Sequence, residues 1–159
     1  MSEAYLSNPN LKKVGVDIEF TQEQIEEYVK CAKDPIYFIR QFVKIIHVDH
    51  GLIPLDLYEY QERMVTTFND NRFVITKMPR QSGKSTAVVG YILHYILFNQ
   101  DKNVALLANK AELARELLDR LKKAYENLPL WLQQGIVVWN KGSIELENGS
   151  KIIATSTTG

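Results

Sequence analysis

The hydrophobic and polar positions follow two periods along the chain, and together they predict alternating strands and helices in its second half. Residues 73–76 and 103–108 are continuous apolar runs of the kind found in buried parallel strands. A long apolar run begins at Thr86, and the apolar positions from 111 to 128 keep the spacing of one helix face until Pro129. Strand, helix, strand, helix in this order predicts a parallel sheet with right-handed crossovers.

The first half of the chain carries local signals for helix starts. Thr21 and Gln24 fit a capping box, in which each side chain bonds the backbone N–H of the other residue. Asp34 followed by Pro35 fits a second start, with Asp34 at the N-cap. The pattern therefore predicts an arm or loop over residues 1–20 and helices over 22–32, from 35 onward, and in a third segment that ends near residue 69.

The last part of the chain reads as short strands. Residues 136–139 and 143–146 are two such runs, and Asn148-Gly149 is a strong signal for a two-residue hairpin turn. Residues 151–154 are the expected return strand.

Composition is ordinary for a globular protein and excludes several classes. The 159 residues are enough for one domain, with 45% hydrophobic and 24% charged residues. Lys plus Arg and Asp plus Glu both number 19, so the net charge is zero, which argues against a strongly basic nucleic-acid module. Cys31 is the single cysteine, so no disulfide can form within the chain and a reducing compartment is expected. The first residues lack a signal-peptide pattern, and the apolar run 87–98 is too short to span a bilayer.

The most specific chemistry lies in Gly83-Lys84-Ser85-Thr86, the second half of a phosphate-binding P-loop between a strand and a helix. Gly83 allows the backbone to approach a phosphate, and Lys84 can place its ammonium against the β- and γ-phosphates. Ser85 can put its hydroxyl on a Mg²⁺ ion that bridges those oxygens, and Thr86 can reach the α-phosphate. The first glycine of the usual pattern is Met78 here, so we expect the loop to leave the strand by another path.

Two further groups of residues have competing interpretations. His47, Asp49 and His50 are close together, but we interpret them as turn residues because no Cys/His cluster supports a metal site. Tyr60 and Gln61 start the third helix. They belong either to an amphipathic helix with Leu57, Tyr60, Met64 and Phe68 inward, or to an adenine site in which the amide bonds the base edge.

One element of a P-loop ATPase is not found in the sequence. Such enzymes need an acidic residue at the end of a neighbouring strand to hold Mg²⁺. Asp101 precedes a strand, and Glu145 and Glu147 lie in a hairpin. We therefore expect the chain to be an N-terminal fragment that stops before the second acidic motif and hydrolyses nucleotide poorly or not at all.

The loop and two flanking motifs resemble one family. The run Arg80-Gln81-Ser82-Gly83-Lys84-Ser85 resembles the deviant Walker A of the large terminase subunits of tailed bacteriophages. The likeness is strongest to those of T-even-type myoviruses, whose segment after the second helix is similar to residues 135–150 and whose adenine motif matches Tyr60-Gln61. It extends from about Thr21 to the end of the chain.

The resemblance implies an α/β fold of the P-loop NTPase type (ASCE or RecA-like), with an incomplete parallel sheet flanked by helices. It divides the chain into an arm (1–20), a helical region (21–56) and an ATPase core (57–159). The expected ligands are ATP and Mg²⁺. The implied roles are a cis arginine finger for Arg80, phosphate and Mg²⁺ binding for Lys84 and Ser85, and base recognition for Tyr60 and Gln61. The rest of the nucleotide-binding loop would be Gln81, Ser82, Gly83 and Thr86.

The resemblance also implies partners and a location. The parent protein would translocate double-stranded DNA into a procapsid, with the portal protein and a small terminase subunit as partners, as a homo-oligomeric ring in the host cytoplasm. It would carry an endonuclease domain that is absent here, and no membrane association is expected. The alternatives are a superfamily-two helicase or translocase, and a nucleotide-binding fragment without turnover.

Overall fold

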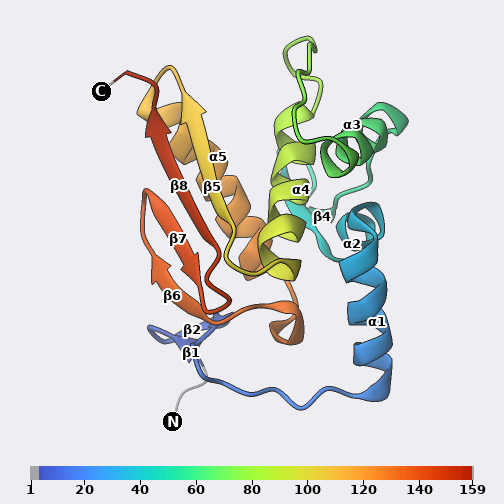
Figure 1. Ribbon diagram of the computed structural model, residues 1–159, viewed down its shortest axis with the longest axis vertical. Helices are drawn as coiled ribbons and strands as arrows, with labels where there is room; N and C mark the ends of the chain where they lie inside the picture. The colour runs from blue at the N-terminus through green and yellow to red at the C-terminus, as the bar shows by residue number, and fades with distance from the viewer. Residues whose placement is uncertain (1–3, 159) are drawn as a thin grey trace.

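The computed structural model describes residues 4–158, and in it the elements fall into layers (Figure 1). A β-sheet lies on one side, and α5 (Ala111–Glu126) packs against it. Next comes α4 (Lys84–Phe98), and the remaining helices lie beyond it. These are α1 (Gln22–Lys33), α2 (Pro35–Phe42) and α3 (Glu59–Asp70).

The sheet is mixed. Its strand order is β5-β8-β7-β6. The strands β5 (Asn103–Ala108) and β8 (Lys151–Ser156) are parallel, whereas β7 (Ser143–Leu146) pairs antiparallel with both β8 and β6 (Ile136–Trp139). The hairpin predicted at Asn148-Gly149 is confirmed, with Gly149 at φ +83° and its N–H donating to the Leu146 carbonyl at 3.0 Å.

The strand predicted at residues 73–76 was wrong. The segment has no regular secondary structure and joins no sheet within residues 4–158. Its side chains are not buried, with Phe73 84% and Ile75 98% exposed. A strand needs a neighbour for its backbone N–H and C=O groups, and the described chain offers none beside this segment. The fold is therefore α/β, but residues 4–158 form no parallel sheet around residues 73–76.

The two faces of the sheet differ. On the face toward α5, Leu106, Ile144 and Ile152 are buried. On the opposite face Leu107 is 61% and Ile153 51% exposed. The alternation of side chains along each strand thus produces one covered and one open face.

The predicted helix starts are confirmed by their caps. Thr21 and Gln24 form the capping box of α1, and the Asp34 carboxylate accepts from the N–H groups of Ile36 and Tyr37 at the start of α2. Each satisfies backbone donors that a helix end leaves unpaired.

The arm predicted for residues 1–20 contains regular structure that the pattern did not indicate. The strands β1 (Ala4–Tyr5) and β2 (Asn8–Lys12) form an antiparallel pair, and Leu11 is buried in the core. Gln133 holds β2 by accepting from the Lys12 N–H (3.0 Å) and donating to the Asn10 carbonyl (2.8 Å). These partners are more than 120 residues away, so no local signal could reveal them.

Glu147 also binds the N-terminal segment, at the end of β2 and just after it. It accepts from the N–H groups of Gly135 (2.8 Å) and Gly15 (3.1 Å) and pairs with Lys12 at 3.5 Å. Burial alone would raise the pKa of Glu147, but these hydrogen bonds and the lysine outweigh it, so the pKa lies below its ordinary value. The carboxylate is therefore a structural anchor.

The hairpin β3 (Lys44–His47) with β4 (Gly51–Pro54) lies behind α4 and contacts α5 (Figure 1). His47 and His50 stack at its turn, 4.9 Å between ring centroids, and the Asp49 N–H donates to His47 Nδ1. The turn interpretation is thus confirmed, and residues 4–158 contain no cluster of metal-ligating side chains. None of the helices described is long and apolar enough to cross a membrane.

Candidate phosphate-binding site

The loop of residues 79–83 enters α4 through a left-handed glycine. Gly83 is the N-cap at φ +70°, and its carbonyl accepts the first helical hydrogen bond from the Ala87 N–H at 3.2 Å. Gln81 also has a positive φ, +59°, which costs energy in a residue with a Cβ. Met78 is not among the positive-φ residues and packs partly against the core. The loop therefore turns at Gln81 and Gly83, not at the position of the missing first glycine.

Lys84 curls back over this loop. Its Nζ donates to the carbonyl oxygen of Pro79 at 3.1 Å, and Ser82 Oγ donates to the same oxygen at 3.0 Å. An anion is a stronger acceptor for an ammonium group than a neutral carbonyl. The bond therefore holds the lysine inside the loop with a partner that a phosphate can replace.

Gln61 fixes the loop from the side of α3. Its side chain is 3% exposed, its Oε1 accepts from the Tyr58 N–H at 2.9 Å, and its Nε2 donates to the Gly83 carbonyl at 3.0 Å. A Cβ at Gly83 would lie 2.5 Å from Nε2, so the close approach requires glycine. Sequence reasoning missed this link because a buried glutamine 22 residues before Gly83 gives no local signal.

Tyr60 lies beside Gln61 and binds the next loop residue. Its hydroxyl donates to the Ser82 carbonyl at 2.8 Å, and its ring stacks on Tyr58 at 5.6 Å. The amphipathic interpretation placed Tyr60 inward with Leu57 and Met64, but Tyr60 is 42% exposed while the other two are buried. The structure thus brings Tyr60 and Gln61 together with the loop.

The other predicted residues surround the same turn. Ser85 and Thr86 are half-buried in the first turn of α4, while Arg80 and Gln81 are exposed. A guanidinium exposed at the loop is free to turn toward a bound phosphate.

Two of the three acidic residues considered from the sequence are engaged elsewhere. Glu145 pairs with Lys151 at 3.1 Å across β7 and β8, and Glu147 anchors the N-terminal hairpin. Asp101 precedes β5 at a φ of +54°.

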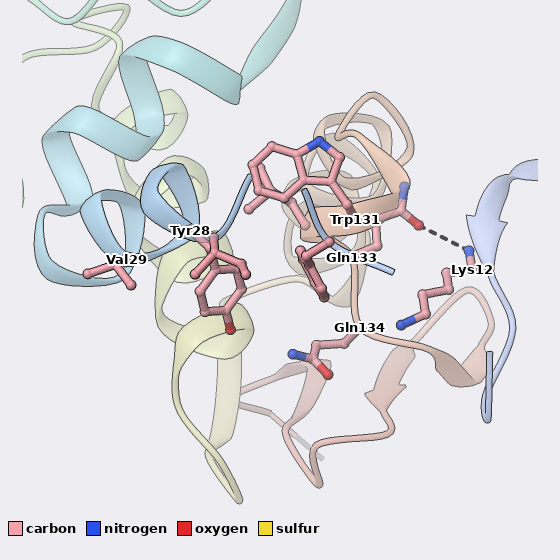
Figure 2. Close-up of a pocket in the computed structure, with 9 residues that line it drawn as sticks. Lys12, Tyr28, Val29, Trp131, Gln133 and Gln134 are labelled. Carbon is pink, nitrogen blue, oxygen red and sulfur yellow. Dashed lines mark hydrogen bonds between the residues drawn. The ribbon is translucent and has the colours of Figure 1, made fainter. Parts of the chain in front are cut away.

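Two cavities differ in where they lie relative to the loop. One of about 420 Å³ lies between the β3–β4 hairpin, α4 and α5, and Thr86 lines it. Another of about 360 Å³ lies between α1 and the segment 131–134, with Tyr28, Val29 and Trp131 in its wall (Figure 2). Gln133 at its edge already bonds to the backbone of Lys12 (Figure 2), so this second cavity is a gap under the N-terminal strands and not a polar site.

Comparison with known families decides the identity of the chain. A family model described as "Terminase large subunit, T4likevirus-type, N-terminal" matches residues 75–158, more than half of the 159. The chain belongs to this family. The match includes the loop, α4, α5 and the whole sheet. The expected resemblance to terminase large subunits is therefore confirmed.

A solved structure supports the same fold. The chain is similar to the protein in "Crystal structure of the HK97 bacteriophage large terminase", with a TM-score of 0.64 and 19% identity over 80% of this chain. At that identity the likeness concerns the fold alone. The terminase chain described here spans 28% of the HK97 chain.

Proposed function

We propose that this chain is the ATPase motor part of a large terminase subunit, an ASCE-type P-loop NTPase that uses ATP hydrolysis to move double-stranded DNA into a procapsid. The observation that carries the proposal is the glycine-capped Lys84 loop at the start of α4, in a chain of this family. An N-terminal helix end offers unpaired N–H groups and a positive dipole end to a phosphate.

In this proposal the loop residues contact different parts of Mg-ATP. Lys84 leaves the Pro79 carbonyl for the β- and γ-phosphates, and the Ser85 hydroxyl joins the Mg²⁺ shell. Gln81, Ser82 and Gly83 wrap the phosphates, and Thr86 contacts the α-phosphate. Mg²⁺ supplies charge neutralisation between the β- and γ-oxygens when it is bound.

Arg80 and the pair Tyr60-Gln61 complete the proposed site. Arg80 is the cis arginine finger, which stabilises charge that develops on the transferring phosphoryl group. Tyr60 and Gln61 border the adenine. Because the Gln61 amide donates to the Gly83 carbonyl, a movement of Gln61 on binding the base would also move the phosphate loop.

The proposed partners follow from the family. They are double-stranded DNA, the portal protein and the small terminase subunit, with the motor acting as a homo-oligomeric ring at the portal vertex in the host cytoplasm. Nuclease activity is assigned to no residue of this chain.

The test measures Mg-ATP binding and hydrolysis separately in the full-length protein. Lys84→Ala removes the ammonium and should reduce binding or turnover to background, whereas Lys77→Ala, an exposed lysine upstream of the loop, should leave both unchanged. ATPase activity that survives in Lys84→Ala would remove the P-loop assignment. Binding without hydrolysis in the wild type would instead indicate a nucleotide-binding module.

A further inference from the structure

The cavity between α1 and the segment 131–134 opens onto a row of exposed apolar side chains. Its volume is about 360 Å³, and Val29 and Trp131 lie in its wall (Figure 2). Phe20, Ile25 and Val29 all line it, and they are 43%, 46% and 43% exposed. Ile25 and Val29 are four residues apart, so they share one face of α1. The described chain thus leaves an apolar groove uncovered along this helix.

Aromatic rings from several elements form the floor of the groove. Trp131 stands edge-on to Phe20, with 6.4 Å between ring centroids, and edge-on to Phe42 of α2 at 5.6 Å. Tyr28 stands edge-on to Phe20 at 6.3 Å and to Phe98 of α4 at 5.1 Å. Rings that contact one another in this geometry stabilise each other's positions. The groove is therefore formed before any partner enters it.

The chain beside the groove is acidic. No lysine or arginine occurs in residues 17–27, which contain Asp17, Glu19, Glu23, Glu26 and Glu27. Glu19 precedes Phe20, and Glu23 and Glu26 lie on either side of Ile25 in the sequence, all three exposed. Among residues 4–158 no lysine or arginine forms an ion pair with these three glutamates. We call them the acidic rim.

The cations near the groove already have partners. Lys12, which lines the cavity, pairs with Glu147 at 3.5 Å. Lys30 follows the acidic segment and pairs with Glu27 at 3.6 Å. The acidic rim is therefore left to attract a positive charge from outside the described chain.

Together these features select the chemistry of the occupant. A contiguous apolar patch with a polar rim is typical of a protein interaction site. The acidic rim repels DNA and anionic lipid, whereas it attracts a basic protein segment. A groove along a helix suits an amphipathic helix, whose apolar side chains recur at every third or fourth residue.

We propose that this groove binds a basic amphipathic helix of a partner protein, which places apolar side chains against Phe20, Ile25, Val29 and Trp131. Lysines or arginines beside those apolar side chains pair with the acidic rim. The proposal concerns a different face from the Lys84 loop and does not depend on nucleotide binding.

The first test uses a fluorescein-labelled synthetic helix with leucines on one face and lysines on the other. Fluorescence anisotropy measures its dissociation constant for the full-length protein, which we expect to be about micromolar. Ile25→Ala/Val29→Ala should weaken binding about tenfold, because the leucines lose their apolar contacts. The matched control is Ile153→Ala/Val137→Ala, an isoleucine and a valine of similar exposure in the sheet, which should bind as the wild type does.

The second test isolates the charge. A control peptide with glutamate in place of each lysine should bind at least about tenfold more weakly than the lysine peptide. Glu19→Gln/Glu26→Gln should weaken binding of the lysine peptide and reduce its dependence on salt. Glu112→Gln/Glu116→Gln, at two exposed glutamates of α5, is the control and should change neither. The glutamine variant removes no apolar contact, so it tests the groove even where the alanine variant unfolds.

Three results would overturn the proposal. One is a wild type that does not bind the lysine peptide, or binds the glutamate peptide equally well. Another is equal affinity in the groove variants and their controls. The third is sedimentation of the full-length protein as a dimer that Ile25→Ala/Val29→Ala dissociates, because the groove would then hold a second copy of the chain.

Discussion

At the scale of single residues, Gln61 joins α3 to the phosphate loop through one buried amide. Both of its polar atoms bond to backbone, the Tyr58 N–H on one side and the Gly83 carbonyl on the other. A buried amide with both polar atoms bonded stabilises a single arrangement, and its removal takes one hydrogen bond from each of these two backbone groups. Gln61 is thus a positioning residue for the loop whatever else it contacts.

Gln61→Ala should lower the free energy of unfolding by about 1–3 kcal/mol, because the Tyr58 N–H loses its acceptor and the Gly83 carbonyl loses one of its two donors in a partly buried place. Urea denaturation monitored by circular dichroism measures this. Tyr60→Phe, which deletes one hydroxyl from a half-exposed ring, is the control and should cost less. Equal stability of Gln61→Ala and the wild type would contradict the positioning role.

Arg80→Ala should lower kcat more than it raises KM, because the proposed arginine finger acts on charge present only in the transition state. Steady-state ATPase kinetics of the full-length protein measure both constants. Arg72→Ala is the matched control at another exposed arginine upstream of the loop, and it should change neither. A loss confined to KM would make Arg80 a ground-state binding residue.

At the scale of elements, α4 is tied to α1 by a buried histidine. His94 Nε2 lies 2.9 Å from the Cys31 carbonyl, and since a carbonyl only accepts, the ring nitrogen carries the proton and donates. Burial lowers the pKa of His94, although hydrogen bonds to the backbone of Cys31 and Ala32 and the charge of Asp34 oppose the shift. The neutral imidazole is therefore the form that the native packing favours.

This packing makes stability depend on pH. The unfolded histidine titrates near its ordinary pKa of about 6.5, while the folded one binds a proton only at lower pH. The stabilisation by the buried neutral imidazole is complete above about pH 6.5. It is lost as the pH falls below that value, because the unfolded state then binds more protons than the folded state. From pH 7.5 to pH 5.5, the urea midpoint of unfolding should fall more for the wild type than for His94→Gln. Identical falls would show that His94 does not titrate on unfolding.

At the scale of the whole molecule, the layers leave one sheet face and one segment without regular structure open to solvent. The segment 72–79 joins no ladder among residues 4–158, while β5 and β8 pair over six residues each. The loop before Lys84 therefore connects a segment without sheet partners to a well-packed helix. Its position depends on α3 and α4 more than on the sheet.

Hydrogen exchange of the 159-residue chain tests this arrangement. Amides of residues 73–76 should exchange rapidly, because no sheet partner accepts their hydrogen bonds, whereas β5 and β8 amides should be protected. Mass spectrometry of peptides from the two regions supplies the comparison. Protection of residues 73–76 equal to that of β5 would show that the segment forms a strand in solution.

The sequence by itself determined the elements whose signals are local. The caps at Thr21 and Asp34, the periodicity of α5, the turn at Asn148-Gly149 and the glycine before Lys84 act within a few residues, so the pattern was enough to predict them. The loop motif also pointed to the family.

Only the tertiary structure decided the features that depend on distant partners. Residues 73–76 have the composition of a strand but lack a neighbouring strand. Residues 4–12 form a hairpin whose second strand is hydrogen-bonded by Gln133, and Glu147 binds the backbone of Gly15 just after it. The apolar pattern shows which residues prefer to be buried, but hydrogen-bond partners far along the chain determine where each segment can satisfy its backbone. For the same reason the link between Gln61 and Gly83 became visible only in the folded chain.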